Sequence, residues 1–163
     1  MSRRYLEEHA SNALFALDIA ERETKHLRYT LNTLFCQNVT ADWLEKVSTD
    51  EALAEKIDAF SSRYGRLQDH LGEKLIPKCA ALFGEPQRSL IDQLSFAERM
   101  GWINDVDGFI QARKLRNLLV HEYVTEAQLF AQALQSAHQS AEMLINCVQV
   151  ISKELSDLGL RQP

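Results

Sequence analysis

Three side chains suited to phosphodiester chemistry follow one another over a short stretch, at Arg116, His121 and Tyr123. Histidine transfers protons near neutral pH, and the planar guanidinium of arginine matches the geometry of a phosphate. In such a site, His121 would move a proton to or from an attacking ribose 2′-hydroxyl while Arg116 stabilises charge on the phosphate. No acidic cluster accompanies these side chains, so the chemistry requires no metal, and we expect no cofactor.

The arginine-to-histidine spacing is not specific, because Arg4 and His9 are separated by the same interval. Arg116 could instead form a weak surface ion pair with Glu122 or Asp105. The histidine could simply end a helix, where the helix dipole favours a cation. The tyrosine could be an aromatic side chain at the edge of the core. Spacing alone therefore leaves a structural reading open.

The overall charge limits how the chain could contact RNA. The formal net charge is −5, whereas proteins that coat nucleic acid are usually strongly basic. Basic residues do concentrate next to the candidate site, at Arg113, Lys114 and Arg116. Any contact with RNA is therefore expected at a local basic spot.

The composition indicates a globular cytoplasmic protein. Hydrophobic residues make up 45% and charged residues 25% of the 163 residues, and no apolar run approaches the length of a membrane span. The three cysteines, Cys36, Cys79 and Cys147, form no C-x-x-C pair. We therefore expect reduced thiols rather than a zinc site or a disulfide framework.

Apolar residues recur at helical spacing in several segments. Stripes are visible over residues 6–38, 53–71, 90–100, 105–121 and 130–155. Each stripe must be buried against another, which predicts an all-α, up-and-down bundle of long antiparallel helices. We expect one domain over residues 1–163. An extended coiled coil is a weaker alternative, because clear breaks separate the segments.

Capping patterns and a proline suggest where these helices begin and bend. Ser48 with Glu51, and Thr125 with Gln128, have the spacing of a capping box at a helix start. Pro77 is expected to kink the end of its helix, because it lacks an N–H and its ring crowds the preceding turn. A short additional helix is possible before the first of these boxes.

The sequence around the arginine resembles a known family. Arg116-Asn117, followed by His121 and Tyr123, is similar to the R-x4-H-x-Y signature of HepT-like proteins of the HEPN superfamily, including the polar residue after the arginine. The similarity extends over most of residues 53–123, and the flanking long helices fit the helical bundle of that family.

Two further segments support the resemblance. Residues 101–103 (Gly-Trp-Ile) precede the motif helix, and residues 62–69 lie in a middle helix, both as in HepT-like proteins. Within the second segment, Arg63 and Arg66 could extend a phosphate-binding surface. We expect a solvated helix face there, and Asp69 could pair with either of these arginines.

The resemblance implies both an activity and partners. It implies a homodimer whose motif residues line a cleft between protomers, and metal-independent endoribonuclease activity of a toxin, with Arg116 and His121 as catalytic residues. It also implies an antitoxin, a minimal nucleotidyltransferase of the MNT type, that silences the toxin by transferring AMP to Tyr123. Asn117, four residues before the histidine, would orient it if that turn is helical.

Helix geometry adds a condition, and a second function remains open. On a regular helix, Arg116 and His121 lie about 140° apart, whereas Arg116 and Tyr123 lie within about 20°. Either the helix breaks near His121 or a second protomer completes the site. The alternative function is a non-catalytic companion subunit that presents substrate to a nucleotidyltransferase. A purely structural bundle would make the motif a coincidence.

Overall fold

The computed structural model describes residues 4–86, 88–121 and 126–161, with the backbone alone described at 120 and 121. This part of the chain is helical and contains no strand. The elements are a 3-10 turn at Glu7–His9, α1 (Ala10–Leu34), α2 (Ala41–Val47), α3 (Glu51–His70), a π-helical turn at Leu71–Leu75, α4 (Ile76–Leu82), α5 (Leu90–Arg99), α6 (Val106–His121) and α7 (Ala127–Asp157).

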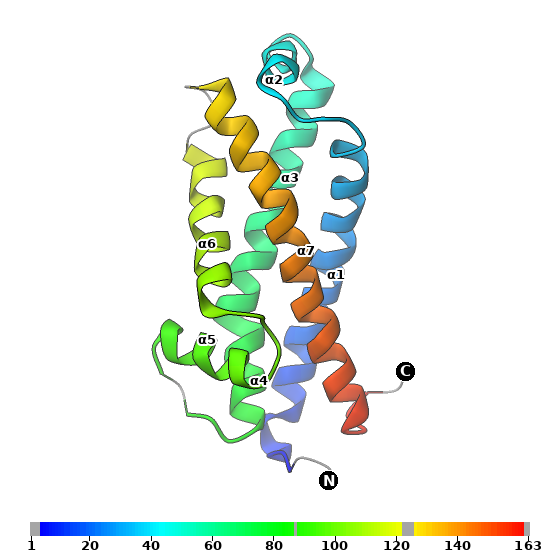
Figure 1. Ribbon diagram of the computed structural model, residues 1–163. Coiled ribbons are helices and arrows are strands. Elements are labelled where there is room, and N and C mark those ends of the chain that lie inside the picture. The colour runs from blue at the N-terminus through cyan, green and yellow to red at the C-terminus, as the bar shows by residue number, and fades with distance from the viewer. Residues whose placement is uncertain (1–3, 87, 122–125, 162–163) are drawn as a thin grey trace.

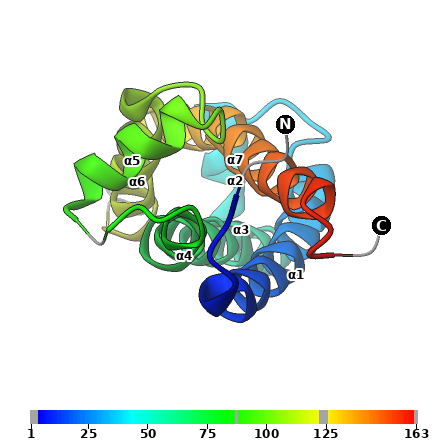
Figure 2. The ribbon, with the colours of Figure 1, turned by 90° about the horizontal axis from the view of Figure 1, so that it is seen from below.

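The long helices form an up-and-down bundle. In Figure 1, α1, α3, α6 and α7 run along the long axis in alternating directions, α2 lies at one end, and both chain ends lie at the other. α1 packs against α3 and α7, and α6 packs against the same two helices, so the four surround a common interior (Figure 2). The predicted all-α, up-and-down bundle is confirmed. Along the described helices, no stretch is both long and apolar enough to cross a lipid bilayer.

The predicted apolar stripe of the last helix forms one wall of the core. All eight of its members are buried: Phe130, Leu134, Ala137, Ala141, Leu144, Val148, Ile151 and Leu155. The small residues Ala13, Ala137 and Ala141 are fully buried where α1 and α7 face one another. Small side chains let the backbones of α1 and α7 come near one another.

The start of α3 differs from the prediction. Asp50, not Ser48, caps this helix, and its carboxylate accepts hydrogen bonds from the first-turn N–H groups of Ala52 and Leu53 at 3.1 and 3.2 Å. The Ser48 hydroxyl instead donates to the carbonyl of Glu45 at 2.8 Å, at the end of α2. A carboxylate directly before the helix is better placed to accept two N–H groups than a hydroxyl two residues earlier.

The remaining helix boundaries also differ in detail. α1 ends at Leu34 rather than near residue 38. The helix containing Pro77 passes through the π-helical turn Leu71–Leu75 before continuing as α4, so the distortion precedes the proline. α7 begins at Ala127 after Glu126, whose side chain makes no capping hydrogen bond. Thr125, the expected cap, lies outside the described residues.

Candidate functional site

The helix that carries the motif is held at its start and at its middle. The carboxylate of Asp105 accepts the N–H of Gly108 at the first turn of α6, as its position before the apolar stripe suggests. One turn further on, the buried hydroxyl of Tyr64 on α3 donates to the carbonyl of Ala112 at 3.0 Å. Phe109 and Ala112 are fully buried. These contacts fix α6 against α3 before the chain reaches Arg116.

Arg116 lies across the surface of α3 at a glycine. A Cβ atom on Gly65 would lie 3.4 Å from Cγ and 3.5 Å from Nε of Arg116, so the stem of the arginine packs directly on the helix backbone. Beyond this contact, Nη2 donates to Oδ2 of Asp69 at 2.8 Å, and Nη1 donates to Oδ1 of Asn117 at 3.3 Å. The guanidinium is thus held between a carboxylate of α3 and an amide of its own helix.

The ion pair between Arg116 and Asp69 is weak. The two side chains are 36% and 38% exposed, and pairs this exposed contribute about 0.2–1 kcal/mol to stability. Nε of Arg116 is buried and has no hydrogen-bond partner among the described residues. Each terminal nitrogen carries two N–H groups, and among the described residues only one on each has an acceptor, which leaves one on each available. Those donors could bind a phosphate oxygen.

The contacts of Asp105 and Asp69 differ from those considered from the sequence. Asp105 caps α6 and does not pair with Arg116, while Glu122 lies outside the described residues. Asp69 pairs with Arg116 rather than with Arg63 or Arg66. No sequence pattern would have revealed this pair, because the two residues are far apart in the chain and meet only when α3 packs against α6.

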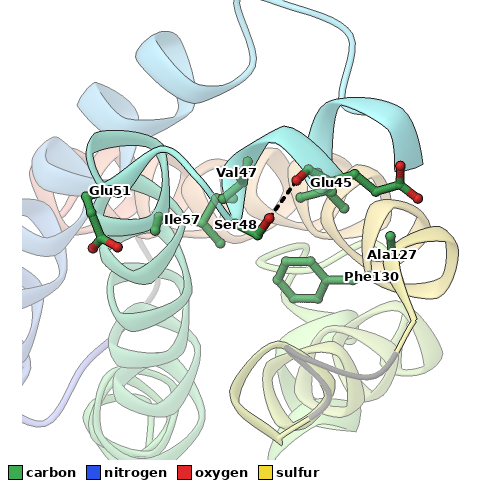
Figure 3. Close-up of a pocket in the computed structure, with 9 residues that line it drawn as sticks. Glu45, Val47, Ser48, Glu51, Ile57, Ala127 and Phe130 are labelled. Carbon is green, nitrogen blue, oxygen red and sulfur yellow. Dashed lines mark hydrogen bonds between the residues drawn. The ribbon is translucent and has the colours of Figure 1, made fainter.

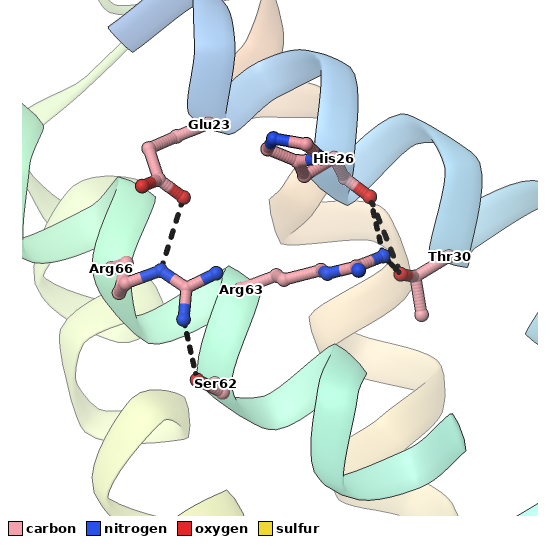
Figure 4. A network of polar contacts seen from close by, with 6 residues as sticks. All are labelled: Glu23, His26, Thr30, Ser62, Arg63 and Arg66. Carbon is pink, nitrogen blue, oxygen red and sulfur yellow. Dashed lines mark hydrogen bonds and ion pairs between the residues drawn. The ribbon is translucent and has the colours of Figure 1, made fainter. Parts of the chain in front are cut away.

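Arg63 and Arg66 connect α3 to α1 and do not form a free basic surface (Figure 4). Arg63 donates to the carbonyl of His26 at 3.1 Å and to the hydroxyl of Thr30 at 2.6 Å. Nε of Arg66 pairs with Glu23 at 3.1 Å. The expected solvated face is therefore only partly solvated, since both guanidinium groups hold the two helices together.

The other motif residues are described in part or not at all. α6 is described as far as His121, and the residues after it, where a chain break was expected, lie outside the described residues. The side chain of His121 is not among those described, and Tyr123 lies outside the described residues. Asn117 is exposed, and its amide oxygen accepts from Arg116, a contact that the sequence did not suggest. The described structure thus joins Arg116 with Asn117 and adds Asp69.

A pocket at one end of the bundle was not foreseen from the sequence. Its volume is about 490 Å³, and Leu44, Val47, Ile57 and Phe130 give it apolar walls. Figure 3 shows it between α2, the start of α3 and the start of α7, with carboxylates such as that of Glu45 at the rim. Carboxylates repel phosphate, so this pocket does not suit the chemistry expected of Arg116.

The buried thiols are poor nucleophiles. Burial raises the pKa of Cys147 to about 12 and also raises the pKa of Cys79 far above its ordinary value. Both thiols therefore stay protonated at neutral pH. Within the described part of the chain, no group of three or more histidine, cysteine or acidic side chains is arranged to hold a metal ion.

Comparison of the chain with models of protein families, with curated protein sequences and with solved structures found no match. The assignment to the HepT-like proteins therefore stays a prediction that rests on the motif residues themselves.

Proposed function

We propose that the chain is a HEPN-type toxin, an endoribonuclease that cleaves RNA without a metal ion. The observation that supports this most directly is the guanidinium of Arg116. It is partly exposed, is positioned by Gly65 and Asn117 on α6, and has N–H donors that no described residue occupies. Such a group suits a phosphodiester, whose charge increases during cleavage.

In the proposed reaction, His121 takes the proton of a ribose 2′-hydroxyl. The 2′-oxygen attacks the adjacent phosphorus, and the bond from phosphorus to the 5′-oxygen of the next nucleotide breaks. The leaving 5′-oxygen takes up a proton from the imidazolium. The products are a 2′,3′-cyclic phosphate and a 5′-hydroxyl. Arg116 stabilises the charge on the non-bridging oxygens throughout.

We further propose that the active form is a homodimer with the site in a cleft between protomers. On a regular helix, positions 116 and 121 lie about 140° apart, so a single helix does not direct both positions to one point. Pairing the arginine of one protomer with the histidine of the other brings both to one phosphate. A two-fold arrangement then creates two equivalent clefts.

The proposal includes regulation by a partner. Tyr123, two residues beyond the end of α6, is proposed as the acceptor of AMP from a minimal nucleotidyltransferase antitoxin. A nucleotide added there would bring bulk and negative charge next to the cleft. RNA, which is also negatively charged, would then be repelled.

Two observations favour a second candidate function. Arg116 is already engaged by Asp69, and the net charge of −5 opposes RNA binding. A non-catalytic companion subunit, which binds a nucleotidyltransferase and presents substrate to it, would need neither a free arginine nor a basic surface.

Incubation of the purified protein with RNA in EDTA separates the two functions. Cleavage should proceed in EDTA and fall about a hundredfold or more in Arg116→Ala and His121→Ala. Arg22→Ala is the control, because it removes an exposed arginine from α1, a helix that does not carry the motif, and it should retain activity within a few-fold. Circular dichroism checks that each variant folds.

Three results would count against the nuclease. Intact RNA at high protein concentration, with mass spectrometry showing an unmodified Tyr123, would favour the companion subunit. Cleavage that is equal in all variants would indicate a contaminating enzyme, while loss of cleavage in EDTA would contradict a metal-independent reaction.

A further inference from the structure

The contact between Asp69 and Arg116 differs from the two-point ion pairs of the bundle. Between Arg28 and Glu142, both terminal nitrogens of the arginine bond separate carboxylate oxygens. Among the described residues, Asp69 receives a single hydrogen bond, from Nη2 of Arg116. Two-point pairs hold a guanidinium more firmly than one-point pairs. The carboxylate of Asp69 therefore contacts the arginine but holds it less firmly than a two-point pair would.

The backbone around Asp69 is fixed, so only its side chain is free to move. Nε2 of the next residue, His70, lies 2.7 Å from the carbonyl of Ala16 on α1. Leu71 is fully buried. Separation of Asp69 from Arg116 therefore requires a side-chain rotation at a half-exposed position and no movement of α3.

We propose that in the free protein Asp69 competes with phosphate for Nη2 of Arg116, and that a phosphate contacting both terminal nitrogens must displace it. This inference rests on the proposed function, because it concerns how the same arginine receives RNA. The carboxylate carries the same charge as a phosphodiester. It accepts from Nη2 of the guanidinium, whereas Asn117 accepts from Nη1. It keeps the arginine extended over Gly65 while lowering the affinity for RNA.

The effect is expected to be modest because the pair is exposed. The usual strength of such pairs corresponds to a difference of about twofold to fivefold in a dissociation constant. A competitor that changes the dissociation constant this little still allows RNA to bind. It also lowers the occupancy of the site by anions that bind weakly.

The test measures binding of a labelled single-stranded RNA by fluorescence anisotropy, in EDTA, with every protein also carrying His121→Ala to prevent cleavage. Asp69→Asn keeps the size of the side chain and removes its charge. Glu73→Gln is the matched control, because it removes one negative charge from an exposed position one turn further along the same helical rod. Asp69→Ser repeats the test with a different side chain.

Asp69→Asn should tighten RNA binding about twofold to fivefold more than Glu73→Gln does. That excess should disappear when Arg116→Ala is also present, because no guanidinium then remains to compete for. Equal effects of Asp69→Asn and Glu73→Gln would overturn the proposal. Weaker binding in Asp69→Asn would also overturn it, and would make Asp69 a residue that positions the arginine.

A second measurement separates this proposal from the nuclease proposal. The NMR signal of the Arg116 Nε–H, identified by its loss in Arg116→Lys, is followed during titration with inorganic phosphate. If phosphate binds Asp69→Asn more tightly than the parent while RNA is neither bound nor cut, the competition stands and the nuclease proposal fails. If RNA is cut but Asp69→Asn and Glu73→Gln respond alike to both ligands, the competition fails and the nuclease proposal stands.

Discussion

At Arg116, a buried stem and an exposed head are combined in one side chain. The stem packs on the backbone of α3 at Gly65, and the head lies between Asp69 and Asn117. The glycine has no positive φ to explain it, so its function here is to give the arginine room. Any larger residue at this position must share that space with the arginine.

Substitution of Gly65 tests this role. The Cβ atom of Gly65→Ala would make only ordinary contacts with Arg116, so we expect near-normal RNA cleavage and, because alanine favours a helix, up to about 1 kcal/mol of added stability. Gly65→Leu should displace the arginine and lower cleavage about as much as Arg116→Ala. Thermal denaturation and RNA cleavage measure the two effects. Equal cleavage by both Gly65 variants would show that the arginine does not need this space.

Among the individual residues of the site, only some could be identified from the sequence. Arg116 and Asn117 were predicted from a local motif, and the structure shows them in contact. Asp69 could have paired with Arg63 or Arg66, which are close to it in the sequence, but both of these reach α1 and Asp69 pairs with Arg116 instead. The correct pair depends on which helices pack together, and no local pattern contains that information.

Among the helices, α3 begins with a different capping residue from the one predicted from the sequence. A Ser-x-x-Glu spacing matched a capping box, but Asp50 lies between the two residues and accepts from two N–H groups. The apolar stripes were more reliable than the caps. They depend on many residues, whereas a cap depends on one side chain that has several competitors nearby.

Paired substitutions at the helix start check this assignment. Asp50→Ala should lower the free energy of unfolding by about 1 kcal/mol, within a usual range of about 0.5–2, because two N–H groups lose their acceptor. Ser48→Ala should cost less, since its hydroxyl bonds a carbonyl at the end of α2. Urea denaturation gives both values. A larger loss in Ser48→Ala would restore the capping box as the correct description.

Over the whole molecule, the bundle could be predicted because each long stripe demands a partner, and four such stripes have few ways to be buried together. The same burial makes the stability depend on pH. The pKa of Cys147 is raised from 9.0 to about 12 by burial, and burial raises that of Tyr64 well above 10. Groups with a raised folded-state pKa contribute stability that is full below their unfolded pKa and is lost as pH rises.

Alkaline denaturation is therefore expected to show a specific slope. Between pH 9 and 12, the free energy of unfolding should fall by about 1.4 kcal/mol per pH unit for each buried thiol. Cys147→Ala should be less stable at neutral pH, because it leaves a cavity, but its stability should decline less steeply above pH 9. Denaturant midpoints at several pH values measure this. An unchanged slope in Cys147→Ala would mean that the thiol is not buried in solution.

The dimeric cleft can be tested by mixing two inactive variants. Arg116→Ala and His121→Ala are each expected to lose RNA cleavage, but a hybrid dimer contains one cleft with both native residues if each cleft takes its arginine from one protomer and its histidine from the other. Random pairing after co-refolding places half of the chains in hybrids, so cleavage in EDTA should return to about a quarter of the parent's rate. An inactive mixture, with hybrid dimers demonstrated by differently tagged chains, would contradict a site shared between protomers.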